Sequence, residues 1–418
     1  MSKEPWFTDK WRVSPFAWND EIRKELHIPK RVHIRSTDPR HADDHPGIVL
    51  SIEEKVKMAE VLDELGVEEL DCGWPAMVQQ DCDFIKALSK AGLKIKKSGV
   101  VRIIAEDVKK EMDIVAESGA DNFQMISELS GRMSERLWGK GSFDKVLPNA
   151  LTMIHYAKEL GLPISFGFVD TLRGDLEWMK SIVRRLPVGG IERFFVYEDQ
   201  VGTPAVMRFI VRQFREILGD TPILVHCHNT FGMATANALA AVEEGVEWVD
   251  CGVNGYGTVA PLEEVVCALE MLYGIGTGIK LEKLYEASKT FEKITGAKFP
   301  KPIVGEEYFV AKRGKEVTTI LRTRGAWPDS AGATFVGSIF DPRVVGRRYG
   351  ISWEHGAGFS TLEEGPDALR LKLDQLMLKY SDENFQELRE RVSRVIKWRK
   401  CVTDAELERL CRQILEES

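Results

Sequence analysis

Short runs rich in β-branched residues alternate with amphipathic segments between residues 32 and 278. In the segment 51–66, SIEEKVKMAEVLDELG, apolar residues recur every three or four positions, which is the spacing of one helix face. Ser51 and Glu54 are spaced as a capping box at the start of this helix, and Gly66 is a typical helix end. The candidate strands are 32–36, 68–73, 95–102, 122–127, 163–170, 192–199, 222–227 and 247–253.

Strands that alternate with helical segments indicate an α/β protein. Eight such units within about 245 residues fit a (β/α)8 TIM barrel, which needs about 250 residues. A doubly wound sheet is the main alternative. The count of eight and the polar residues that end most of the strands favour the barrel.

The βα rhythm stops after residue 280. Residues 304–360 are rich in Gly, Arg and Thr without clear periodicity, and residues 361–418 return to amphipathic helical patterns. We therefore expect an N-terminal arm over 1–30, a barrel over 31–278, and a mixed, mainly helical linker and cover region over 279–418.

Composition and charge narrow the classes of partner. The chain has 418 residues, 44% of them hydrophobic and 29% charged, with 57 Lys and Arg against 65 Asp and Glu, a net charge of −8. Binding to nucleic acid or to an anionic membrane needs a basic face, so neither is expected. Seven cysteines without a CxxC pair indicate a reducing, cytoplasmic location. The first 26 residues lack the continuous apolar core of a signal peptide.

The segment HCHN at the end of the seventh strand carries the strongest chemical signal. The period of two in an extended chain places His226 and His228 on the same side, where both can bind one metal ion. The alternative is a pair of histidines that are hydrogen-bonded in a polar loop.

A third ligand would have to come from another strand. The loop after the first strand, STDPRHADDHPG, contributes Arg40 and His41, although His41 is equally compatible with a solvated loop histidine. Asp71 ends the second strand, where it could bind a metal-bound water, orient Arg40 or act as a base. A structural salt bridge between Asp71 and Arg40 is the competing interpretation.

Three further polar residues follow strands and are candidates for substrate binding. Arg102 ends the third strand, and a guanidinium binds a carboxylate through two parallel hydrogen bonds. Asp170 follows the fifth strand, although a carboxylate at a strand end is often only a cap. Asn254 begins the glycine turn NGYG after the eighth strand, with an amide that could reach a ligand. The chain has no GxGxxG or Walker loop, which disfavours nucleotide hydrolysis.

At these residues the chain resembles the HMGL-like, metal-dependent TIM-barrel family of isopropylmalate, homocitrate and Re-type citrate synthases and hydroxymethylglutaryl-CoA lyase. The resemblance covers nearly the whole chain: the first βαβ unit over 32–76, the HCHN and NGYG region over 225–257, and tail segments such as FDPRVVG and WEHGAGFS. The N-terminal PWFTDKWRVSPF is similar to that of Re-citrate synthase-like members.

The resemblance implies one divalent metal ion, Mg, Mn, Zn or Co, bound by an aspartate and an HxH pair. The substrates would be a 2-oxo acid and an acyl-CoA, whose enolate attacks the 2-oxo carbonyl; lyases run this chemistry in reverse. His226 and His228 match the ligand pair, and Arg40 matches the arginine that polarises the carbonyl. A homodimer, in which the tail of one chain covers the other chain's barrel, is also implied.

The sequence departs from the family pattern at the chemistry itself. His41 stands where the metal-binding aspartate is usual, and Asp71 where a glutamate is usual. The family's asparagine in an AGN segment has no counterpart, and Glu316 in RGKEVTT stands where a catalytic histidine is usual. The chain could therefore be a condensing enzyme with His41, His226 and His228 around the metal, a carbon–carbon lyase or aldolase, or a non-catalytic binding relative.

Overall fold

The computed structural model describes most of the chain. The described residues are 5–6, 14–45, 47–127, 130, 141–198, 202–297, 310–311, 350–351, 366–399 and 402–417.

Eight parallel strands close into a barrel in chain order, β1 to β8. They are β1 His33–Ser36, β2 Glu69–Asp71, β3 Lys96–Arg102, β4 Asn122–Ser127, β5 Ile164–Phe168, β6 Phe194–Glu198, β7 Ile223–Cys227 and β8 Trp248–Cys251. Strand β1 pairs with both β2 and β8, so the sheet has no edge. The predicted TIM barrel is thereby confirmed and the doubly wound sheet is excluded.

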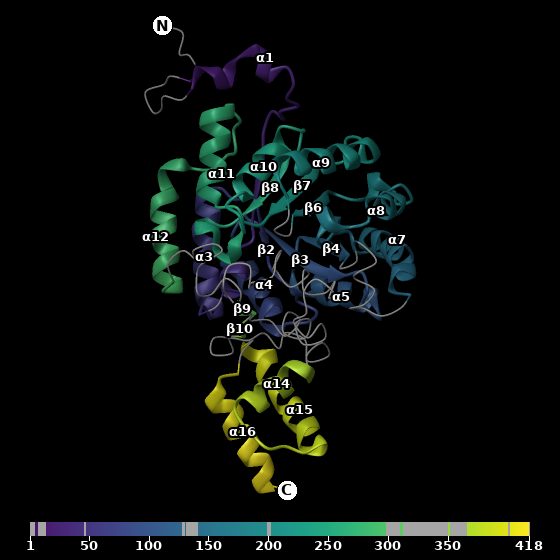
Figure 1. Cartoon of the computed structure of the whole chain (residues 1–418), viewed down its shortest axis with the longest axis vertical. Coiled ribbons are helices and arrows are strands. Elements are labelled where there is room, and N and C mark those ends of the chain that lie inside the picture. Colours follow the sequence, from purple (N-terminus) through teal and green to yellow (C-terminus); the bar gives the residue numbers. More distant parts are fainter. Residues whose placement is uncertain are drawn as a thin grey trace.

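Helices surround the strands on the outside of the barrel (Figure 1). They are α2 Arg40–Asp43, α3 Ile52–Leu65, α4 Gln79–Ala91, α5 Val108–Ser118, α7 Ser142–Leu160, α8 Leu176–Val183, α9 Pro204–Leu218, α10 Ala234–Val242 and α11 Leu262–Ala268. Helix α3 has the predicted capping box between Ser51 and Glu54 and ends at Gly66 with a positive φ of 99°. No helix in the described ranges is long and apolar enough to cross a membrane.

Helical segments also precede and follow the barrel. They are α1 Asp20–Arg23 before it, and α12 Leu284–Thr295, α14 Pro366–Gln375, α15 Asp382–Arg399 and α16 Asp404–Glu417 after it, together with the two-residue strands β9 Val310–Ala311 and β10 Gly350–Ile351. Phe291 of α12 belongs to the barrel's hydrophobic core, whereas Leu369, Phe385 and Leu407 belong to a separate core of the C-terminal helices. The C-terminal helices form the lower end of the molecule in Figure 1. The division into 1–30, 31–278 and 279–418 stays a prediction.

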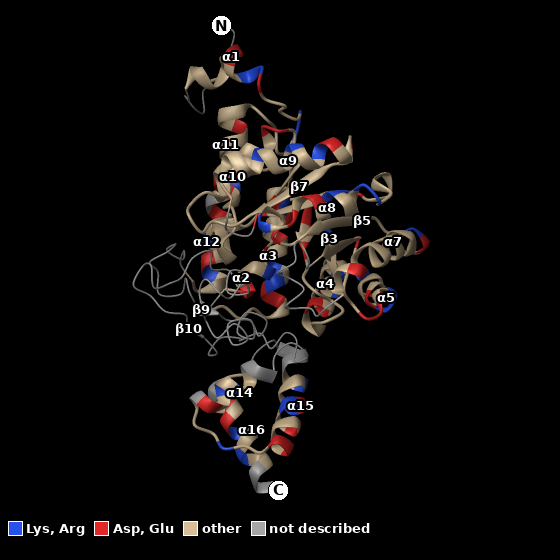
Figure 2. Ribbon diagram, turned by 45° about the vertical axis from the view of Figure 1, so that its right-hand side comes forward, with Lys and Arg blue, Asp and Glu red and all other residues tan. Residues whose placement is uncertain are grey.

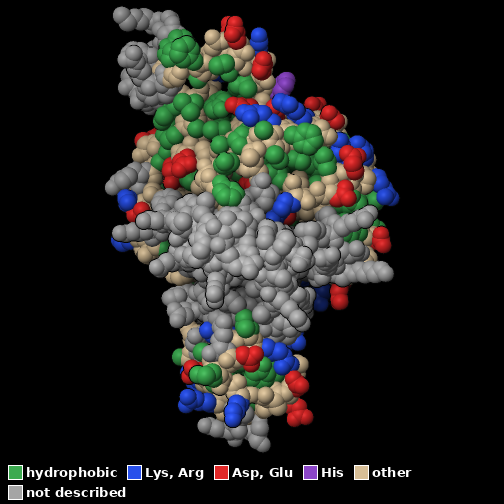
Figure 3. All heavy atoms as spheres, in the orientation of Figure 1, with side chains coloured by type: hydrophobic (Ala, Val, Ile, Leu, Met, Phe, Trp, Pro, Cys, Tyr) green, Lys and Arg blue, Asp and Glu red, His purple; other side chains and the backbone are tan. Residues whose placement is uncertain are grey.

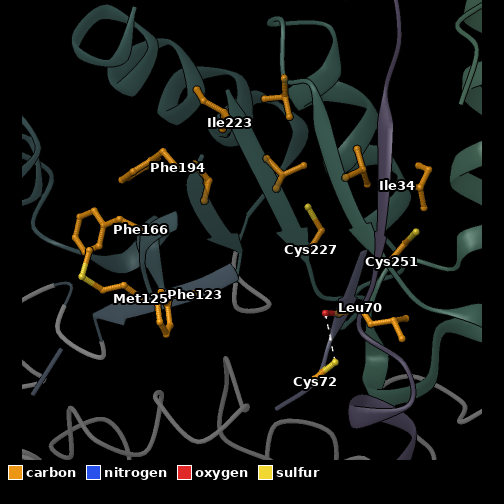
Figure 4. Close-up of a cluster of buried hydrophobic side chains, with 14 of the residues drawn as sticks. Ile34, Leu70, Cys72, Phe123, Met125, Phe166, Phe194, Ile223, Cys227 and Cys251 are labelled. Carbon is orange, nitrogen blue, oxygen red and sulfur yellow. Dashed lines mark hydrogen bonds between the residues drawn. The ribbon is translucent and has the colours of Figure 1, made fainter. Parts of the chain in front are cut away.

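The strands alternate two kinds of side chain, as the two-residue period requires. One set is apolar and joins the helices in a continuous buried core, part of which Figure 4 shows with Ile34, Phe123, Phe166 and Cys251 labelled. The other set contains the buried polar residues Arg35, Gln124, His226 and Asp250. Because the apolar set packs against the helices, the polar set lies inside the barrel.

Charged side chains lie on the outside of the molecule among hydrophobic and uncharged ones. Acidic and basic residues lie on helices around the barrel and along the C-terminal helices (Figure 2). On the face drawn in Figure 3, the two signs of charge are interspersed over the described surface.

Removing one buried aromatic ring tests the apolar layer. Phe166 is fully buried and its ring centroid lies 4.8 Å from that of Phe168. We expect Phe166→Ala to lower the free energy of unfolding by about 3–5 kcal/mol, because the substitution leaves a cavity that the barrel cannot close. Thermal unfolding followed by circular dichroism measures the loss. Phe209→Ala on α9 is the matched control, since Phe209 is 50% exposed. An equal loss of unfolding free energy in both variants would contradict the claim that Phe166 packs in the buried core between strands and helices.

Candidate active site at the carboxyl ends of the strands

The two histidines of the HCHN segment converge at the end of β7. His226 Nε2 lies 3.1 Å from His228 Nε2. His226 is buried, and its Nδ1 donates to the Asp250 Oδ2 carboxylate oxygen of β8 at 3.0 Å. This bond leaves the proton on Nδ1, so the Nε2 lone pair of a neutral His226 points toward His228.

The histidine pair fits one divalent ion. At the 2.0–2.1 Å nitrogen–metal distance of zinc, two nitrogens 3.1 Å apart subtend about 95 to 100° at the ion, within the range of tetrahedral and octahedral sites. Asp250 supplies the carboxylate that orients a metal-binding histidine in such centres. The pair alone provides two ligands. Among the described residues, no group of three or more His, Cys, Asp or Glu side chains has the arrangement of a complete metal site.

His41 lies beside this pair. Its ring centroid is 5.3 Å from that of His226 and 5.9 Å from that of His228. Its Nε2 accepts a hydrogen bond from Arg40 Nη2 at 2.6 Å, because a guanidinium can only donate. Metal binding through His41 Nε2 and this bond to Arg40 are therefore alternatives.

Arg40 and Asp71 form the predicted pair. Arg40 Nε donates to Asp71 Oδ2 at 2.8 Å and Arg40 Nη2 lies 2.7 Å from the same oxygen. Burial alone would raise the pKa of Asp71, but the guanidiniums of Arg40 and Arg35 and the amide of Gly73 outweigh it and hold the pKa below its usual range. A carboxyl with a lowered pKa is a poor base, so the geometry supports the interpretation that Asp71 orients Arg40.

A set of ion pairs inside the barrel, beneath these residues, was not found by the sequence reasoning. Arg35 of β1 is fully buried and contacts three carboxylates, those of Glu69, Asp71 and Asp250. The signal in the sequence was the presence of charged residues within otherwise apolar strands, in VHIRS, EELDC and EWVDC. A charge inside a buried strand requires a partner on a neighbouring strand.

The three predicted substrate-binding residues all have partners in the chain. Arg102 donates to Glu111 Oε1 of α5, from Nε at 3.0 Å and from Nη2 at 2.5 Å. Arg173 Nε donates to both oxygens of Asp170 at 2.8 Å. The third residue, Asn254, contacts Ser288 of α12. Substrate roles for these residues stay predictions.

Asn254 is buried and links the loop after β8 to α12. Its amide Nδ2 donates to the Ser288 carbonyl at 3.2 Å, and its Oδ1 accepts from Ser288 Oγ at 2.5 Å. Its positive φ of 60° shows that Asn254 also shapes the turn. Glu316, the remaining predicted residue, lies outside the described residues.

Comparisons with known proteins agree with this geometry. The closed barrel with its polar residues gathered at the carboxyl ends defines a TIM-barrel enzyme. A sequence model described as HMGL-like matches residues 31–291, and the chain belongs to this family.

Similar curated proteins are synthases from archaea. A homocitrate synthase of Methanopyrus kandleri is 32% identical over 404 residues, which span 95% of this chain and 96% of that protein. An (R)-citramalate synthase of Methanocaldococcus jannaschii is 32% identical over 392 residues, 92% of this chain and 74% of that protein. A 2-isopropylmalate synthase of the same organism is 31% identical over 407 residues, 95% and 75% of the two chains.

Solved structures agree in fold. The HMG-CoA lyase of Bacillus subtilis superposes with a TM-score of 0.58 at 20% identity, over 66% of this chain and 97% of that chain. The carboxyl transferase domain of Rhizobium etli pyruvate carboxylase gives 0.52 at 15% identity, over 95% and 79%. At these identities the likeness establishes the barrel fold alone.

Asp38, in the loop between β1 and α2, makes the stability of the protein depend on pH. Burial raises its pKa well above the usual value; the Val253 amide that donates to Oδ2 at 2.7 Å opposes this, and the nearby Glu263 carboxylate adds to it. The folded protein therefore keeps the Asp38 carboxyl protonated at pH values above about 3.9, where the unfolded chain has lost this proton. The free energy of unfolding of the wild type falls as the pH rises from the unfolded pKa to the raised pKa of the folded state.

We expect Asp38→Asn to remove this loss, since asparagine keeps an oxygen for the Val253 amide but carries no charge. The stability of the variant relative to wild type should increase as the pH is raised above the unfolded pKa of about 3.9, as measured in urea unfolding series. Asp220→Asn, at an exposed position, should show no such trend. A gap between Asp38→Asn and wild type that stays constant with pH would contradict the raised pKa.

Proposed function

We propose that this protein joins an acyl-CoA to a 2-oxo acid, as an acyl-CoA:2-oxo acid C-acyltransferase. The observation that carries the proposal is the place of His41, which is hydrogen-bonded to Arg40 and lies beside the histidine pair at the carboxyl end of the barrel. This arrangement occurs in a chain that is about 32% identical, over nearly its whole length, to homocitrate and citramalate synthases. A carbon–carbon lyase or aldolase remains the alternative within the same family.

The residues at the site fit one divalent metal ion, Mg, Mn, Zn or Co. His226 and His228 would bind it, and His41 is proposed as a third ligand in exchange for its bond to Arg40. An imidazole-rich set favours Zn or Co over Mg. A bound divalent ion supplies Lewis-acid polarisation of the 2-oxo carbonyl.

The chain's own residues supply orientation and charge. Asp250 holds the Nδ1 proton of His226, which keeps Nε2 available as a ligand. Asp71 aims the Arg40 guanidinium, whose donors stabilise negative charge as the carbonyl oxygen becomes an alkoxide. His41 in place of a carboxylate makes the site one unit more positive, which favours an anionic substrate.

The overall reaction balances without an external oxidant. A proton leaves the α-carbon of the acyl-CoA, the new carbon–carbon bond forms at the 2-oxo carbon, and the alkoxide takes up a proton. Water then cleaves the thioester and releases free CoA. Glu316 is proposed for a proton transfer on the family resemblance alone. A homodimer and a cytoplasmic location stay predictions.

The metal proposal predicts that single histidine variants lose the ion. Wild-type protein purified without chelator should hold about one divalent metal ion per chain, whereas His226→Ala or His228→Ala should hold less than about a tenth of that. Inductively coupled plasma mass spectrometry measures the content. His155→Ala is the control, because the His155 side chain is 74% exposed on α7. Equal metal content in all four proteins would place the ion elsewhere.

The reaction itself is tested with a free-thiol assay of acetyl-CoA against a panel of 2-oxo acids. Release of CoA that requires a 2-oxo acid supports the proposal, and Arg40→Ala should lower kcat by about 10²–10³-fold because it removes a donor to the alkoxide. Formation of a 2-oxo acid from a 2-hydroxy acid would favour the lyase instead. Ligands that raise Tm without any turnover would indicate a binding relative.

A further inference from the structure

The interior ion pairs connect the two halves of the proposed site through one residue, Arg35. Its backbone lies opposite Glu69 of β2 and Asp250 of β8 in the strand register. Its side chain has no exposed area, so it cannot act on a substrate by itself. Its Nε donates to Glu69 Oε1 at 3.1 Å, and an Nη2 hydrogen bond reaches Gln124 of β4.

Two single carboxylate oxygens connect Arg35 to the residues of the site. On one side, Asp250 Oδ2 accepts from Arg35 Nη1 at 2.6 Å and lies 3.0 Å from His226 Nδ1. On the other side, Asp71 Oδ2 lies 3.7 Å from Arg35 Nη2 and accepts from Arg40 Nε at 2.8 Å. The planar guanidinium therefore sets the distance between the carboxylate that orients His226 and the carboxylate that orients Arg40.

The ionic group joins three arginines to buried carboxylates. Arg35, Arg40 and Arg193 contact Glu69, Asp71 and Asp250, and two partly exposed carboxylates, Asp44 and Glu192, also contact Arg40 and Arg193. Such a group is stable in a buried place only when each member keeps its partners. A lysine at position 35 would keep the charge, but its ammonium on a flexible stem cannot reproduce the fork that spans these carboxylates.

We propose that Arg35 is a positioning residue that fixes His226 relative to Arg40, and thereby the metal relative to the group that stabilises the alkoxide. The inference rests on the proposed function. Its chemical consequence is large, because a misplacement of about 1 Å between reacting groups costs about 10²-fold in rate.

The experiment compares Arg35→Lys with Arg193→Lys. Arg193 is also buried and also contacts Glu69, through Nη2 and Oε2 at 2.5 Å, but it precedes β6 at the opposite end of the strands. Both variants thus weaken the same ionic group and keep its charge. Each protein is titrated with Co²⁺, and its visible spectrum, kcat and KM for the 2-oxo acid are measured.

We expect Arg35→Lys to shift the cobalt spectrum, to weaken Co²⁺ binding about 10- to 100-fold and to lower kcat about 10²-fold with little change in KM. Arg193→Lys should lose a comparable amount of thermal stability and keep the wild-type spectrum and kcat. If the two variants have the same spectrum and kcat, the role of Arg35 is only structural and the inference is overturned.

The cobalt spectrum separates this inference from the proposed function. If only Arg35→Lys shifts the spectrum and the wild type has no condensing activity, the positioning role is supported and the proposed function is contradicted. If the wild type condenses its substrates and the two variants do not differ, the proposed function is supported and the positioning role is contradicted. Wild-type protein with neither cobalt binding nor turnover overturns both.

A milder variant covers the case in which Arg35→Lys does not fold. Gln124→Leu removes a neutral partner of the Arg35 guanidinium and of the Tyr197 hydroxyl, and Gln124 has no hydrogen bond to Asp250 or Asp71 among those described. We expect Gln124→Leu to shift the cobalt spectrum away from that of the wild type and to lower kcat by less than the roughly 10²-fold expected for Arg35→Lys. An unchanged spectrum and kcat in Gln124→Leu would overturn the positioning role.

Discussion

Charge neutralisation inside a closed barrel is the constraint on which the rest of this structure depends. Glu69, Asp71 and Asp250 lie in strands that are buried on all sides, where an unpaired carboxylate would cost several kcal/mol. Arg35 contacts all three, so it must occupy the barrel interior in one orientation. The inward orientation of Arg35 fixes which face of β1 meets the helices, because the residues directly before and after Arg35 in the strand point outward.

The chemistry at the carboxyl ends follows from this interior arrangement. Asp250 orients His226, and Asp71 orients Arg40 and stays ionised because two guanidiniums lower its pKa. The polar groups of the site are therefore held by the side chains of Asp71 and Asp250, each of which is only 1% exposed. This is the arrangement expected of a preorganised site, in which dipoles and charges are fixed before the reaction begins.

The departures from the family pattern are concentrated where the chain can change its chemistry without changing its scaffold. His41 lies beside the histidine pair and is hydrogen-bonded to Arg40, so one residue combines the proposed third metal ligand with a partner of the arginine proposed to stabilise the alkoxide. The HMGL-like barrel itself is intact. We therefore interpret the altered loop after β1 as a change in metal or substrate preference within a condensing enzyme.

The sequence by itself determined the features that depend on local spacing: the eight βα units, the capping box of Ser51 and the histidines of HCHN on one side of β7. Only the tertiary structure decided the partners of those residues. Arg35 and Asp250 are 215 positions apart in the chain and meet because barrel closure places β1 beside β8. Arg102 donates to Glu111 because α5 packs back on β3. Local patterns set which face a side chain occupies, but which charge it meets depends on closure of the sheet.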